Sequence, residues 1–146
     1  LRVTAHDATP QRMKDLPLRA ARAGVEITIA EGKQKLRSAG YDVVLCDVPC
    51  SGSGAWRRSA EAKWTLTPDR LAALVEVQAR ILDETCGLVA DGGVLAYATC
   101  SLFAAENRDQ IDRFLHRVPG WSLLQETRLT PLDGADGFYL ALLTRA

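Results

Sequence analysis

Short apolar runs rich in β-branched residues alternate along this chain with longer stretches in which apolar residues recur at helical spacing. Four such runs are found, at residues 1–6, 25–30, 41–47 and 94–98. This alternation is typical of a parallel α/β sheet with crossover helices. The run at 41–47 (YDVVLCD) is apolar almost throughout, so we expect a central strand that is covered on both faces.

Proline, glycine and threonine mark the ends of two predicted helices. Pro10 lies in the first turn of a helix that continues to about Ala23, and Gly24 closes it. Thr67 is the predicted N-cap of a longer helix with Pro68 at its first position, because a threonine side chain satisfies free N–H groups there.

The last third of the chain changes pattern. A turn at 91–93 is predicted to lead into the strand at 94–98, and an amphipathic helix is predicted over 104–117. Residues 121–125 and 138–143 are then expected to form an antiparallel pair across a glycine-containing loop. We therefore predict a parallel sheet with an antiparallel addition at its C-terminal end.

Composition narrows the class of protein. A chain of 146 residues with 47% hydrophobic content can bury one core, as expected for one domain or part of one. Eighteen basic residues balance eighteen acidic ones, so any surface for nucleic acid must be local. No stretch approaches the roughly 20 apolar residues of a membrane span. The four cysteines form no CxxC pair, which favours a reducing cytoplasm over a disulfide framework.

Polar side chains with chemical functions follow each predicted parallel strand. The four strands end near Asp7, Glu31, Asp47 and Cys100 in turn. Because ligands of open α/β sheets bind beyond the carboxyl ends of the strands, we expect a cleft with three carboxylates and a thiol.

A second thiol, Cys50, lies in the glycine- and serine-rich loop at 47–54. Its glycines would let the backbone approach a ligand closely, although a simple strand-exit turn explains the same pattern. The other two cysteines, Cys46 and Cys86, lie in apolar runs and are interpreted as small buried hydrophobes.

Cys100 is predicted to lie just before the helix over 104–117. Free N–H groups and the macrodipole at a helix N-terminus favour an anion, so the thiolate of Cys100 should form readily. We expect Cys100 to be alkylated faster than Cys86.

Between the thiol loop and the long helix, three cations are interleaved with two tryptophans: Trp56, Arg57, Arg58, Lys63 and Trp64. Phosphates pair with such cations and unstacked bases lie on aromatic faces. A charged helix face with tryptophan anchored in the core is the alternative, but the position beside the thiol loop favours RNA.

Several motifs occur together in this sequence: Asp47-x-Pro-Cys50-Ser-Gly-x-Gly54, Arg57-Arg58, Lys63-Trp64, Tyr97-Ala-Thr-Cys100-Ser, Glu106-Asn107 and Asp136-Gly137-Phe138. Together they resemble the RNA 5-methylcytosine methyltransferases of the Sun or Fmu type, most of all the bacterial enzymes that act on ribosomal RNA. The resemblance implies a class I S-adenosylmethionine-dependent methyltransferase with a Rossmann-like sheet. The implied substrate is a cytidine in small-subunit (16S) ribosomal RNA, with transfer RNA as the alternative.

The resemblance also implies roles for the site residues. C5 of cytosine is a poor nucleophile, so the Cys100 thiolate would add to C6 and make C5 enamine-like. Cys50 would assist the release that restores aromaticity. Asp47 would border the cofactor and hydrogen-bond the N3/N4 edge of the base.

Four further residues carry implied binding roles. Asp7 would hold the ribose hydroxyls of S-adenosylmethionine. Glu31 occupies a position where the family usually has an aspartate that borders the adenine. Arg58 and Lys63 are the candidates for contacts with RNA.

One part of the family pattern is missing, namely the first strand and the glycine-rich cofactor loop, which would precede Leu1. Residues 1–146 are therefore interpreted as the C-terminal portion of the catalytic domain. The missing strand would lie between 1–6 and 41–47, so its absence should leave two facing edges unpaired. We expect the chain alone to be an inactive, incomplete folding unit, with the gap filled by an upstream segment of the parent protein or by strand exchange in a homodimer.

Two other functions are compatible with parts of the sequence. A cysteine-dependent hydrolase would need a histidine to activate the thiol, and neither His6 nor His116 lies in the motif loops. A catalytically silent RNA-binding or assembly module remains the main alternative, because the cofactor loop is missing.

Overall fold

A computed structural model describes residues 1–145, except for the side chain of Gln34. The chain forms two compact units, one over Leu1–Arg37 and the other from Ser38 onward. Each unit contains its own sheet, and the two sheets have two and four strands.

The first unit is a small β–α–β arrangement. Strands β1 (Val3–Ala5) and β2 (Ile27–Ile29) pair in parallel, with Val3 opposite Ile27. The predicted helix between them is split into a 3-10 turn, η1 (Pro10–Met13), and helix α1 (Leu16–Arg22). Pro17 lies at the second position of α1 and has no N–H to donate to the Met13 carbonyl, so no helical hydrogen bond connects α1 back to η1 at this point.

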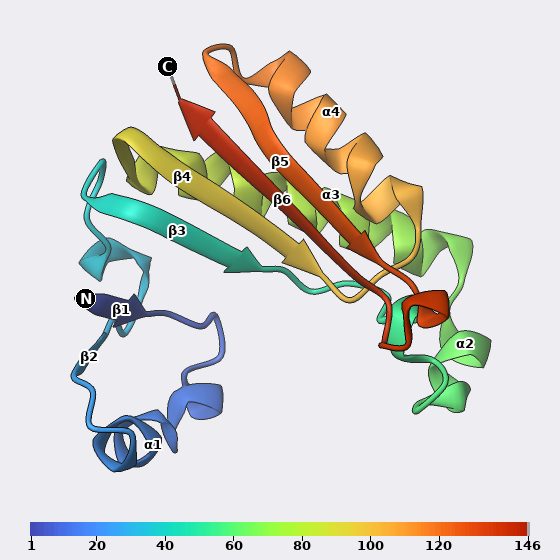
Figure 1. Cartoon of the computed structure of the whole chain (residues 1–146), viewed down its shortest axis with the longest axis horizontal. Coiled ribbons are helices and arrows are strands. Elements are labelled where there is room, and N and C mark those ends of the chain that lie inside the picture. Colours follow the sequence, from blue (N-terminus) through green and yellow to red (C-terminus); the bar gives the residue numbers. More distant parts are fainter. Residues whose placement is uncertain (146) are drawn as a thin grey trace. The chain divides into compact units, whose positions relative to one another are not determined.

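The second unit is a mixed sheet in the order β3-β4-β6-β5 (Figure 1). Strand β3 (Tyr41–Asp47) runs parallel to β4 (Val89–Thr99). Strand β6 (Phe138–Arg145) pairs antiparallel with both β4 and β5 (Trp121–Leu129). The predicted antiparallel addition is confirmed, with both strands longer than expected.

Two helices cover one face of this sheet (Figure 1): α3 (Pro68–Thr85), which connects β3 to β4, and α4 (Arg108–Arg117). The Thr67 side chain accepts a hydrogen bond from the Arg70 amide, as expected for the predicted N-cap. The core between helices and sheet consists mainly of fully buried apolar residues, among them Leu82, Leu95, Tyr97, Ile111, Phe114, Tyr139, Ala141 and Leu143.

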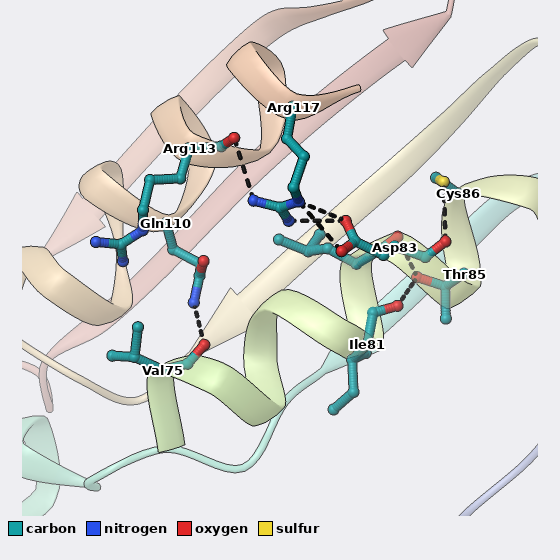
Figure 2. A network of polar contacts seen from close by, with 9 residues as sticks. Val75, Ile81, Asp83, Thr85, Cys86, Gln110, Arg113 and Arg117 are labelled. Atoms are coloured by element: carbon teal, nitrogen blue, oxygen red, sulfur yellow. Dashed lines mark hydrogen bonds and ion pairs between the residues drawn. The ribbon is translucent and has the colours of Figure 1, made fainter. Parts of the chain in front are cut away.

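Polar contacts also join α3 to α4 (Figure 2). Gln110 on α4 donates to the backbone oxygen of Val75 on α3 at 2.7 Å. Nearer the other end of the two helices, the guanidinium of Arg117 holds the carboxylate of Asp83, with a shortest distance of 2.7 Å. Polar contacts therefore hold α3 and α4 together at two points along their length.

The prediction that 41–47 is a central strand covered on both faces is wrong for the described residues. Strand β3 is an edge strand, and Val43 and Leu45 on its second face are 62% and 65% exposed. The reason is that β3 pairs only with β4, while both helices lie on the other face. The unpaired edge of β3 agrees with the expectation that strands 1–6 and 41–47 each lack a neighbour on one side. Strand β1 likewise pairs only with β2.

The predicted turn at 91–93 lies inside β4 as a bulge. Tyr41 pairs with Val89, but Val43 pairs with Val94, so β4 holds extra residues opposite Asp42. Gly92 has φ of 72°, which a glycine adopts without a steric penalty. The bulge brings β4 back into register with β3, so that Asp47 lies opposite Ala98.

Candidate active site

The two motif cysteines lie on loops that leave neighbouring parallel strands. Cys50 follows β3 and Cys100 follows β4, and the Sγ atoms are 3.4 Å apart. Cys100 is exposed, whereas Cys50 is half-buried. The structure therefore places two thiols in contact at the carboxyl end of the sheet.

The two thiols differ in environment. Burial, together with the neighbouring Cys100 sulfur, raises the pKa of Cys50 to about 12. The Cys50 thiol therefore keeps its proton near neutral pH and can donate it toward Cys100. Of this pair, Cys100 is the more exposed to solvent.

The predicted adjacency of Cys100 to a helix N-terminus is wrong. Helix α4 begins at Arg108, and a 3-10 turn over Ala104–Glu106 lies between it and the cysteine. Because the effect of a helix dipole falls off within the first turn, the dipole of α4 does not act directly on the Cys100 thiol.

A buried carboxyl group lies beneath both cysteine loops. Glu106 is fully buried and accepts hydrogen bonds from Ser51, Ser101 and Gln78. Ser51 follows Cys50 directly and Ser101 follows Cys100 directly. The sequence analysis assigned no role to this network, although a glutamine at a core position of α3 and a serine after each cysteine were signals for it.

Further hydrogen bonds hold the Cys100 loop. The Thr99 hydroxyl donates to the side chain of Asn107 at 2.7 Å, and the Asn107 amide donates to the Ser101 carbonyl at 2.8 Å. The backbone N–H of Gly54 donates to the Cys100 carbonyl at 2.9 Å. The loop that carries one cysteine is thus bonded directly to the loop that carries the other.

The loop before β6 closes against the same region. Gly54 and Gly137 approach so closely that a Cβ built on Gly54 would lie 2.3 Å from the Gly137 oxygen. Asp136 in this loop forms an ion pair with Arg58, whose Nε donates at 2.7 Å. The predicted RNA contact Arg58 is therefore held in place by a carboxylate while remaining largely exposed.

Comparison with known proteins assigns the family. The model for the 16S rRNA methyltransferase RsmB/F family matches residues 1–144. The chain belongs to this family. The resemblance drawn from the two cysteine motifs is confirmed. Ribosomal RNA small subunit methyltransferase B from Salmonella newport and from Salmonella enteritidis are each 34% identical over 98% of this chain. The chain spans 36% of the length of these curated relatives.

Solved structures show the same fold. PH0851 superposes with a TM-score of 0.91 at 28% identity, over 99% of this chain and 37% of that one. A methyltransferase homologue from Pyrococcus horikoshii and NSun6 from the same organism, solved with SFG, each give 0.81 over 99% of this chain, at 22% and 20% identity. They are covered over 53% and 41% of their lengths. The expected α/β methyltransferase fold with its C-terminal antiparallel strands is confirmed.

In this RsmB/F-family chain, the other predicted site residues fall into both units. Asp7 and Glu31 follow β1 and β2, which are adjacent parallel strands, so both lie at the carboxyl end of the two-stranded sheet. The Asp7 carboxylate accepts the Thr9 amide at 2.7 Å, and Glu31 is exposed and 3.8 Å from Lys35.

The remaining predicted residues lie in the second unit. Asp47 is the exposed last residue of β3 and borders an apolar groove on the sheet face away from the helices, next to Ala98 and Phe138. Lys63 lies on helix α2 (Ala60–Thr65), with its Nζ 5.0 Å from the centre of the exposed Trp64 ring.

The two tryptophans of the basic segment have different environments. Trp64 is 81% exposed, whereas Trp56 is half-buried and packs edge-on against Phe103 at 5.8 Å between ring centres. Trp56 therefore joins the thiol loop to the segment after Cys100. No helix among residues 1–145 has the length and apolar character of a membrane span.

Proposed function

We propose that this chain is the C-terminal part of a catalytic domain that transfers a methyl group from S-adenosylmethionine to C5 of a cytidine in RNA. The reaction would proceed through a covalent bond between Cys100 and C6, with 16S ribosomal RNA as the substrate. The observation that carries the proposal is the contact of the two motif thiols at 3.4 Å, with Cys100 exposed and Cys50 half-buried. The names of the curated relatives support the ribosomal substrate.

The chemistry requires a nucleophile that also leaves. The Cys100 sulfur would form a bond to C6, and the electron pair of the C5–C6 double bond would become available at C5 to take the methyl group. The bond between that methyl group and the sulfonium sulfur would break, with its electron pair staying on the sulfur. A base, such as water, would then take the proton from C5, and the electron pair of that C–H bond would restore the double bond as the sulfur–carbon bond breaks. Cys100 departs with the electron pair of that bond and is regenerated.

Cys50 fits the second half of this cycle. Because its pKa is raised to about 12, it is a thiol near neutral pH and does not compete with Cys100 for C6. Its S–H lies against the sulfur that must leave C6, so it can stabilise negative charge on that sulfur. We therefore assign Cys100 to attack and Cys50 to assisting release.

The carboxylates fit the cofactor and the base. Bound S-adenosylmethionine supplies an electrophilic methyl group on a sulfonium. Asp7 and Glu31 offer acceptor oxygens at the carboxyl ends of adjacent parallel strands, where ribose hydroxyls and adenine amines are held in Rossmann-like sheets. We assign Asp47 to the cofactor and to the N3/N4 edge of the cytosine.

For RNA, we assign two exposed cations that follow the thiol loop in the sequence. Arg58 and Lys63 are both exposed, and the neighbouring Trp64 offers an open aromatic face. Phosphates pair with such cations, and bases stack on such rings. RNA is thus the proposed partner, and we place its modification in the cytoplasm.

We further propose that the 146-residue chain is inactive by itself. Among the described residues, β1 and β3 each leave one edge without a strand, and the expected glycine-rich loop is not in the sequence. A strand-exchanged homodimer would pair these edges. Light scattering and calorimetry test this, since a stable monomer that binds S-adenosylmethionine tightly contradicts both statements.

The catalytic roles are tested in the full-length protein with RNA and S-adenosylmethionine. Cys100→Ala should abolish both methylation and the covalent RNA adduct. Cys50→Ala should accumulate an adduct that survives a denaturing gel, because attack proceeds and release fails. Cys86→Ala is the matched control and should retain full turnover. Methylation by Cys100→Ala, or no trapped adduct with Cys50→Ala, would contradict the assignment.

A further inference from the structure

Each cysteine of the proposed site is followed by a serine, and both serines bond to the same buried carboxyl group. We propose that Glu106 is a positioning residue that sets the distance between the Cys50 and Cys100 sulfurs. This inference rests on the proposed function for its catalytic meaning, but the geometry it describes is independent of RNA and cofactor.

The carboxyl oxygens of Glu106 divide their contacts. Oε2 accepts the hydroxyls of Ser51 and Ser101, each at 2.5 Å. Oε1 accepts the Ser51 amide and the side-chain amide of Gln78, each at 2.9 Å. A carboxylate has about four acceptor positions, so this one is fully used. One oxygen, Oε2, therefore joins the loop after β3 to the loop after β4.

Core residues hold Glu106 in place. The hydroxyl of Tyr97 on β4 donates to the Glu106 carbonyl at 2.6 Å. Gln78 on α3 donates both to Glu106 and to the Pro49 carbonyl, again at 2.9 Å. Glu106, Gln78 and Tyr97 are all fully buried. A strand residue, Tyr97, thus holds the backbone of Glu106, and a helix residue, Gln78, holds its carboxyl group.

Because Glu106 is fully buried, loss of the hydrogen bonds to its carboxyl group would carry a large free-energy cost. A carboxylate removed from water is strongly destabilised unless hydrogen bonds replace its hydration. The four donors around Glu106 provide that replacement. Without the carboxyl group, the four donors, which belong to Ser51, Ser101 and Gln78, would lose this acceptor at once, and the two loops would lose the bridge through Oε2.

Two substitutions of Glu106 distinguish the effect of its hydrogen bonds from the effect of its charge. Glu106→Gln can keep its oxygen toward the Ser51 amide and Gln78, and its NH₂ toward the two hydroxyls, which also accept hydrogen bonds. Glu106→Ala removes the bridge altogether. We therefore expect glutamine to rescue the spacing that alanine loses.

Gln110→Ala is the matched control for destabilisation. Gln110 is also fully buried and donates to the Val75 carbonyl (Figure 2). It bonds to Gln78 as well, and to no described residue of either cysteine loop. It should lower stability and leave the thiols in place.

The spacing is measured with phenylarsine oxide, whose arsenic bonds to two sulfurs at once. The reaction consumes two thiols, replaces the oxygen on arsenic with two As–S bonds and releases one water. Tight one-to-one binding needs two sulfurs held near each other, so its affinity reports their spacing. The unmodified chain, Glu106→Gln and Gln110→Ala should bind with affinities within about threefold of one another.

Glu106→Ala should bind phenylarsine oxide at least about tenfold more weakly, because the loops must be reordered on binding. Unchanged affinity in this variant, an equal loss in Gln110→Ala, or an equal loss in Glu106→Gln would each overturn the proposal. Should Glu106→Ala fail to fold, the double variant Ser51→Ala, Ser101→Ala replaces it. The double variant should also lose at least about tenfold, and unchanged affinity there overturns the proposal equally.

Activity of the full-length protein gives the second readout. Glu106→Ala should lower kcat about tenfold or more and leave the KM for RNA nearly unchanged, whereas Glu106→Gln should restore kcat. A change in KM alone would contradict a positioning role. If Cys100→Ala were still active, the proposed function would fail while the arsenical affinities would still decide the role of Glu106.

Discussion

Gly54→Ala should damage the junction between the cysteine loop and the loop before β6. The added methyl group would lie 2.3 Å from the backbone oxygen of Gly137 and 2.7 Å from its Cα. These are backbone atoms, so no side-chain rotation can relieve the overlap, and one of the two loops must move. The movement endangers two hydrogen bonds of 2.9 Å, from Gly54 to Cys100 and from Gly137 to Gly54.

The expected loss of unfolding free energy follows from these contacts. Overpacking costs about 1–3 kcal/mol, and each net hydrogen bond about 0.5–1.5 kcal/mol. With partial relaxation, we expect Gly54→Ala to lose about 2–4 kcal/mol. Urea unfolding followed by tryptophan fluorescence measures this loss in the second unit, because Trp56, Trp64 and Trp121 all lie there.

Gly87→Ala is the control, because a Cβ at Gly87 meets no atom within 4 Å and its φ is not in the left-handed region. It should change stability by less than about 1 kcal/mol, in either direction. The reasoning is refuted if Gly54→Ala is no less stable than Gly87→Ala. It is also refuted if Gly54→Ala leaves the affinity for phenylarsine oxide unchanged.

Two further predictions concern the thiol and the core. Cys50 ionises near pH 9.0 when unfolded and at about pH 12 when folded, so iodoacetamide should label it after Cys100 at pH 8. The unfolded state sheds this proton first, so the unfolding free energy should fall between pH 9 and 12, and less steeply in Cys50→Ala. Leu82→Ala, at a fully buried position of α3, should cost about 2–5 kcal/mol in urea unfolding, and a loss below 1 kcal/mol would contradict the packing described.

The sequence was sufficient where the signal is local. Strand 41–47 has the predicted bounds, because this run is apolar almost throughout. Thr67 caps α3 because a hydroxyl just before Pro68 satisfies an N–H group three residues further on. The motifs around Cys50 and Cys100 also sufficed to assign the family, since they specify a chemistry that few other proteins share.

Part of the site followed from topology predicted in this way. Because strands 41–47 and 94–98 were expected to be parallel, Cys50 and Cys100 were expected at one rim of the sheet. The contact of their sulfurs at 3.4 Å was not predictable, because it depends on the bulge that aligns β3 with β4 and on the path of two loops.

Only the tertiary structure decided the rest. Glu106 lies 55 residues from Ser51 and 28 residues from Gln78, so their network joins three segments that no local pattern relates. No local pattern predicts the ion pair of Arg58 with Asp136 either, because the two residues are 78 positions apart. The exposure of Val43 and Leu45 also depends on the position of their strand at the edge of the sheet. Hydrogen-bonding capacity and apolar character belong to each residue alone, but partners and burial depend on which distant segments the fold brings together.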